Sequence, residues 1–119
     1  MESILTSIKK LLGIAEEYTH FDEDLIIHIN SVFATLTQIG VGPSEGFTIA
    51  DKYATWDNFI SDSTSLISVK TYVHLKVRLL FDPPANSAVM SSIERQISEF
   101  EWRLHLTAET LADAAKENG

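Results

Sequence analysis

The residues of this chain that could do chemistry are four histidines and a few clusters of acids. No HExxH motif and no two histidines four residues apart are present, so the histidines lack a metal-ligand spacing. His20 with Asp22 and Asp24 could touch a hard cation, but acids at the start of a helix are more simply partners of the helix dipole. The other three histidines are His28, His74 and His105.

Other catalytic arrangements are missing from the sequence. The chain has no cysteine, which excludes disulfides, thiol catalysis and zinc–thiolate sites. Its five glycines are scattered, so no glycine-rich phosphate loop is present, and nothing resembles a nucleophile elbow. Spacing alone does not separate a catalytic carboxylate pair from a solvated acidic face. The sequence predicts no catalytic, cofactor-binding or metal-binding residue and a protein that is not an enzyme.

Length and composition indicate one soluble domain of 119 residues. The formal net charge of −8 disfavours non-specific binding to nucleic acid, which needs a basic surface to release counterions. No apolar run approaches the roughly 20 residues of a membrane-spanning helix, so no membrane partner is expected. The first residues also lack the layout of a signal peptide.

The charges are unevenly distributed along the chain. The first sixty residues hold nine acids and only three lysines, whereas no acid lies between Asp62 and Asp82. That second span carries Lys70, Lys76 and Arg78. These cations either pair with acidic neighbours in the same chain or form an interface with an acidic surface of another copy.

Hydrophobic spacing predicts an all-α fold, a small bundle of about four helices. The first helix covers residues 2–12 and stops at Gly13, with two lysines in its last turn facing the helix dipole. The second carries an apolar stripe from Leu25 to Ile39, and Thr19 or Asp22 is expected to cap it.

A long, partly extended loop is predicted between the second and third helices, over residues 41–60. Residues 47–49 alternate like a short extended segment. Tyr53, Trp56 and Phe59 then follow without clear periodicity. These aromatic side chains either plug one edge of the core or anchor on a neighbouring subunit, because long loops in small domains are often bound to partners.

A helical hairpin is predicted where the third helix, with its stripe from Leu66 to Leu80, meets the fourth. Two consecutive prolines cannot continue a helix, since each lacks a backbone N–H and restricts the preceding residue. The chain must therefore reverse here and let two apolar faces pack together. The turn consists of Phe81, Asp82, Pro83 and Pro84, and the expected helix caps are Asp62 or Ser63 for the third helix and Asn86 or Ser87 for the fourth.

The fourth helix is expected to carry its stripe to Leu104. Trp102 falls off this stripe and indicates a second packing surface or a subunit contact. We divide the chain into a helical domain over residues 1–106 and a tail over 107–119, which either extends the helix or orders on a partner. A helix-turn-helix DNA reader is disfavoured, because the helix after the prolines has no basic residue before Arg95.

The most distinctive strings of the sequence are VKTYVHLKVRLLFDPP, from Val69 to Pro84, and ERQISEFEWRL, from Glu94 to Leu104. With ILTSIKKLLGI near the N-terminus, the GVGPSEGF loop and the segment around Trp56, they resemble the head–tail connector (adaptor) proteins of tailed bacteriophages and prophages. The resemblance spans most of the chain up to about Leu106, and its motifs are structural.

The resemblance implies a non-enzymatic virion component. It implies a ring of identical subunits, twelve-fold in the virion, that joins the portal to the next connector or tail protein while DNA passes through the lumen without specific binding. The location implied is the head–tail interface of the virion, assembled in the cytoplasm of the bacterial host. An alternative is a small helical interaction or regulatory adaptor outside a virion. The subunit interface is expected to use Trp56, Phe59, Lys70, Lys76, Arg78 and Trp102.

Overall fold

The structure is a computed structural model that describes residues 2–61 and 63–118, without the side chains of 63, 112 and 114–118. The described residues contain no strand, and one isolated antiparallel bridge joins Ser3 to Thr55. The predicted all-α fold is therefore confirmed. The helices are α1 (Ile4–Leu11), α2 (Asp22–Gln38), α3 (Trp56–Phe59), α4 (Ser63–Phe81) and α5 (Ser87–Asn118).

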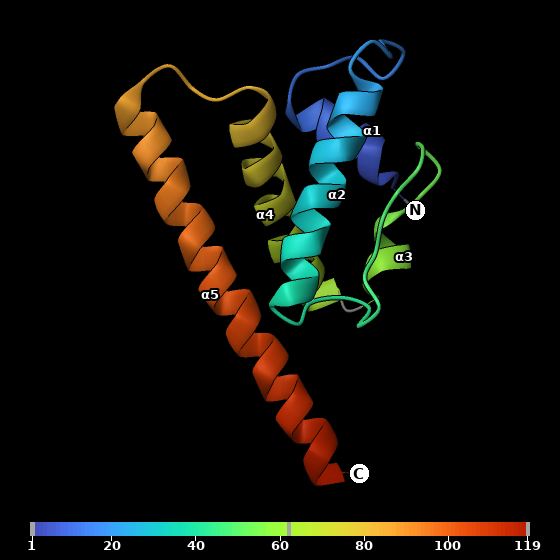
Figure 1. Ribbon diagram of the computed structural model, residues 1–119, viewed down its shortest axis with the longest axis vertical. Coiled ribbons are helices and arrows are strands. Elements are labelled where there is room, and N and C mark those ends of the chain that lie inside the picture. Colours follow the sequence, from blue (N-terminus) through green and yellow to red (C-terminus); the bar gives the residue numbers. More distant parts are fainter. Residues whose placement is uncertain (1, 62, 119) are drawn as a thin grey trace.

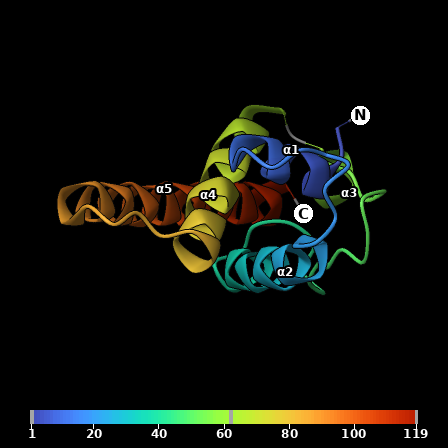
Figure 2. The same ribbon diagram turned by 90° about the horizontal axis from the view of Figure 1, so that it is seen from above.

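The central helix of the bundle is α4, which packs against both α2 and α5, while α1 packs against α2 (Figure 1). Seen from above, α2 runs along one edge of the molecule, and α5 passes behind α4 through the middle of the view (Figure 2). The extents of 47, 35 and 20 Å make the protomer a flat body, and Figure 1 views it along the shortest of these axes.

The predicted hairpin joins α4 to α5. The α4 helix ends at Phe81, and the N–H of Asp82 still donates to the carbonyl of Arg78 at 2.8 Å. Asn86 then caps α5, because its Oδ1 accepts from the N–H groups of Ala88 and Val89 at 2.8 and 3.1 Å. The double proline lies between these two ends, so the turn and the cap at Asn86 are both confirmed.

The segment after residue 106 continues α5 rather than forming a separate unit. The helix is continuous from Ser87 to Asn118. Its C-terminal part extends past the ends of the other helices, away from the rest of the bundle (Figure 1). The C-terminal end of α5 therefore lies apart from the described helices α1 to α4 (Figure 1).

The predicted cap of α2 is wrong. The helix begins at Asp22, and the residue before it, Phe21, makes no side-chain capping bond. Neither Thr19 nor Asp22 acts as a cap, because the Asp22 carboxylate turns toward Lys9 of α1 instead. The expected cap of α4, at Asp62 or Ser63, lies outside the described side chains.

The loop between α2 and α4 is more ordered than its composition predicts. It contains the four-residue helix α3, whose start is fixed by Asn58: Oδ1 of this residue accepts from the N–H of Thr55 at 2.9 Å. Residues 47–50 are non-helical, and the side-chain amide of Asn30 bonds both backbone polar groups of Ile49, at 2.7 and 3.0 Å. One α2 side chain thus holds the extended part of the loop as a strand partner would.

Candidate interaction surfaces

An apolar groove of about 360 Å³ lies beside α5. Val41, Phe59, Leu104 and Leu111 contribute to its lining, and none of the lining residues is titratable. Among the residues that the structure describes, no group of three or more His, Asp or Glu is placed to hold a metal ion. The groove therefore offers apolar packing rather than acid–base chemistry.

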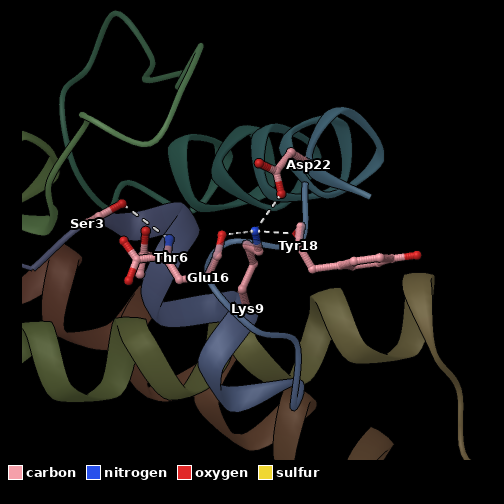
Figure 3. A network of polar contacts seen from close by, with 6 residues as sticks. All are labelled: Ser3, Thr6, Lys9, Glu16, Tyr18 and Asp22. Carbon is pink, nitrogen blue, oxygen red and sulfur yellow. Dashed lines mark hydrogen bonds and ion pairs between the residues drawn. The ribbon is translucent and has the colours of Figure 1, made fainter. Parts of the chain in front are cut away.

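A buried lysine network joins α1 to the start of α2 (Figure 3). The Lys9 side chain is only 2% exposed, and its Nζ donates to the carbonyls of Glu16 and Tyr18 at 2.8 and 2.7 Å. The same nitrogen forms an ion pair with the buried Oδ1 of Asp22 at 2.8 Å, and no other described residue gives this oxygen a hydrogen bond. Lys9 thus fixes the connector between the two helices, and Asp22 is already committed and is not free to bind a cation with His20 and Asp24.

Two of the proposed interface residues lie in the core. Trp56 is 1% exposed, and its Nε1 donates to Oγ of Ser7 at 2.8 Å. Phe59 is 3% exposed and stacks against Phe33 with 4.6 Å between ring centroids. Both rings pack inside the protomer, as the first of the two interpretations expects, whereas Tyr53 is 75% exposed. Trp56 and Phe59 therefore offer very little surface to a neighbour.

The three cations of α4 have different surroundings. Lys70 lies 3.4 Å from a carboxylate oxygen of Glu2 and 5.8 Å from the centroid of the Trp56 ring. Lys76 lies 3.9 Å from Glu101 of α5. Arg78, in contrast, forms no ion pair with any acid in the described part of the chain. The expectation of pairing inside the protomer thus holds for two of the three cations.

Glu101 also accepts a hydrogen bond from the hydroxyl of Tyr72 at 2.7 Å, which ties α5 to α4. Burial, together with this hydrogen bond and the charge of Glu101, raises the pKa of Tyr72 far above its usual value. Burial and the nearby Arg78 lower the pKa of His74. Near neutral pH the outward charge on this part of α4 therefore comes from Arg78.

Exposed apolar side chains mark the outer faces of α2 and α4. Residues three and four apart share one side of a helix, and on each of these two helices that side carries one large, exposed isoleucine. Ile27 is 65% exposed and Ile67 is 73% exposed. We call the α2 outer face the set Glu23, Asp24, Ile27, Ser31 and Ala34, and the α4 outer face the set Ile67, Thr71, His74 and Arg78.

A third exposed site is the α5 outer pair, Trp102 and Leu106. These two residues are 65% and 46% exposed, and they lie one helical turn apart on the side of α5 away from the buried Leu104. Sequence periodicity located Trp102 because this residue falls off the core stripe. Ile27 falls off its own stripe in the same way, and its position was the available signal for the α2 outer face.

The comparison with known protein families gives one result. A family model for phage connector proteins matches residues 4–110. The chain belongs to the phage connector family. Neither the curated proteins nor the solved structures that were searched contain a match.

The family match covers nearly all of the described bundle. Phage connectors are structural proteins, and the match takes in α1 to α4 and most of α5. The suspected relationship to head–tail connectors is therefore confirmed at the level of the family. In the described ranges, no helix is both long and apolar enough to cross a bilayer.

Proposed function

We propose that this phage connector is one subunit of a ring that joins the portal to the tail or to the next connector protein. The observation that carries the proposal is the family match over residues 4–110, together with large apolar side chains left open on the outer faces of three helices. A partner that covers these side chains removes their apolar surface from water, which favours association. Arg78 and Trp102 remain candidate interface residues, whereas Lys70 and Lys76 first serve contacts within the protomer.

DNA passage through the ring is consistent with the charge of the chain. The net charge of −8 gives an acidic particle, and a channel lined by acidic surfaces repels the duplex rather than holding it. DNA would therefore move through the lumen without specific binding. The ring would be twelve-fold, would act at the head–tail interface of the virion and would be assembled in the host cytoplasm.

Portal attachment is assigned to the end of α5, which extends past the bundle (Figure 1). A truncation that tests this must spare the core. Ala108 packs against the core cluster, and Leu111 lines the apolar groove, so a chain that ends after Leu111 keeps both contacts. We expect this shortened chain to fold and form rings but to lose most of its binding to purified portal. Equal portal binding by the shortened and full chains would show that the anchor lies elsewhere.

The ring itself is tested by negative-stain microscopy and native mass spectrometry of the full chain, alone and with purified portal. The expected result is a closed ring in at least the portal-bound sample. A chain that stays monomeric and does not bind the portal would contradict the proposal and would favour an interaction module that works outside the virion.

A further inference from the structure

We propose that the α4 outer face of one copy docks on the α2 outer face of the next copy, so that these two helices form the subunit interface of the ring. This inference rests on the proposed ring and names the surfaces that build it. A ring of identical subunits needs two different, complementary patches on each copy, because a patch that pairs with itself produces a closed dimer instead. The α2 and α4 outer faces are two such patches.

The charges of the two faces are complementary. Glu23 and Asp24 are exposed at the start of α2, and neither forms an ion pair among the described residues. Arg78 is the α4 cation that has no acid partner among the described residues of its own copy. An α4 face packed on another α4 face would leave Arg78 without an acid, whereas an α4 face packed on an α2 face supplies two. Complementary charges of this kind select the correct partner and register.

The shapes of the two faces also fit. Each face has one large apolar side chain, Ile27 or Ile67, and the rest of each face includes small residues such as Ser31, Ala34 and Thr71. A large side chain on one helix can therefore settle over small residues on the other. Burying each isoleucine removes apolar surface that water now contacts, which is the main favourable term of such an interface.

The heights of the residues along the helix axes fit neighbours that are related by rotation about a ring axis. The rings of Phe21 and Phe81 lie 5.2 Å apart, so within one copy the end of α4 is level with the start of α2. Arg78 is near that end of α4, and Glu23 and Asp24 are at that start of α2. A neighbour generated by rotation about an axis along these helices keeps the same levels. It therefore brings Arg78 opposite the two acids and Ile67 toward the other end of α2.

The two faces are also separated within one protomer. The α2 helix runs along one edge of the molecule (Figure 2) and packs against α4, and its buried residues include none of the α2 outer face. Val69, Val73 and Val77 of α4 are fully buried, and the α4 outer face lies on a different side of that helix. One copy can therefore engage two neighbours at once, as closure of a ring requires.

Cysteine cross-linking tests the interface directly, because the natural chain has no cysteine to give a background. Ser31→Cys and Thr71→Cys, placed together in one chain, put a thiol near the middle of each outer face. With a short bis-maleimide we expect a ladder of multimers that ends at the ring. Either single variant should give no ladder, and Ser31→Cys combined with Tyr53→Cys serves as a matched control with an exposed thiol outside both faces.

A second experiment separates the two faces. Ile27→Asp should disable the α2 outer face, and Ile67→Asp should disable the α4 outer face, with little effect on folding because both side chains are highly exposed. Each variant alone should form rings at least ten-fold less than the natural chain. In an equimolar mixture, the intact α4 outer face of Ile27→Asp can still dock on the intact α2 outer face of Ile67→Asp. With Thr71→Cys added to the first variant and Ser31→Cys to the second, cross-linking should therefore yield dimers and nothing larger.

The outcomes distinguish the interface from the ring. If the natural chain forms rings while the double-cysteine variant gives no ladder and Ile67→Asp still assembles normally, the proposed interface is wrong and the ring stands. If the natural chain forms no ring, alone or on the portal, the proposed function fails and the interface fails with it.

Discussion

Replacing Lys9 by methionine is expected to lower the free energy of unfolding by about 3 kcal/mol. The substitution keeps the length and apolar stem of the side chain but removes the ammonium group. That group satisfies the carbonyls of Glu16 and Tyr18 and neutralises the Asp22 carboxylate. Removing one partner of a buried ion pair costs about 3–5 kcal/mol, mostly because the other charge stays buried.

The low end of that range applies because Asp22 retains 25% of its side-chain exposure and regains some hydration. The two carbonyls add to the loss, since a buried acceptor without its donor costs about 1–3 kcal/mol unless water reaches it. Glu16 and Tyr18 are exposed residues, so water can replace much of what the lysine supplied. The expected loss in the free energy of unfolding therefore remains about 3 kcal/mol, which corresponds to a fall in Tm on the order of 10 °C for a chain of this size.

Urea unfolding followed by circular dichroism measures the change, and Lys10→Met is the matched control. Lys10 is the next residue in the same helix but is exposed, so its replacement should stay within about 0.5 kcal/mol of the natural chain. A loss below about 1 kcal/mol for Lys9→Met, or equal losses for the two variants, would refute the role assigned to the buried lysine.

Three further predictions concern the core and its ionisable groups. Gly42→Ala should lower the free energy of unfolding by about 2–5 kcal/mol, because Gly42 has a φ of +85° and the new Cβ would lie 2.4 Å from the Phe59 ring. Gly13→Ala is the control: its φ is a similar +81°, but its Cβ would meet no atom within 4 Å, so urea unfolding should show a loss of only about 1–2 kcal/mol. The pKa of Tyr72 is raised in the folded state, so its stabilising effect is present below pH 10 and is lost at higher pH; Tyr72→Phe should therefore flatten the fall in stability with alkaline pH. The pKa of His74 is lowered from 6.5, so the stability that it contributes is present above pH 6.5 and is lost as the pH falls. His74→Gln should therefore reduce the loss of stability between about pH 6.5 and 5 in the same assay. An unchanged dependence of the unfolding free energy on pH would contradict this assignment.

Hydrophobic spacing and proline chemistry predicted the helices and the turn, because these features depend on residues close together in the sequence. The stripe from Leu25 to Ile39 repeats at the helical period, and the prolines after Phe81 remove backbone donors whatever surrounds them. The cap at Asn86 follows from the same kind of rule. These features depend on residues within a few positions of each other, so one sequence is enough to locate them.

The features that escaped prediction depend on contacts between distant residues. Lys9 is buried because α2 brings Asp22 to it and because the connector supplies two carbonyls, and periodicity reports neither. Burial of Trp56 was one of the two interpretations of the sequence, but the acceptor of its N–H, Ser7, lies 49 positions earlier and could not be foreseen. A loop composition predicts no helix, so α3 was also missed, although Thr55 and Asn58 carry the spacing of a capping box.

The apolar stripe of α5 indicates where this protein needs a partner. Leu104 is 5% exposed and Ala108 is partly buried, but Leu111, next on the same side of the helix, is 60% exposed. The helix thus continues to Asn118 after its own core has ended, and a segment this short is marginal in water without a surface to pack on. We expect backbone amides after Leu111 to exchange rapidly in the free chain and at least ten-fold more slowly on the portal, as measured by hydrogen exchange with mass spectrometry. Amides in the buried middle of α4 should exchange equally slowly in both states, and equal exchange of the α5 end in both states would contradict its assignment as the portal anchor.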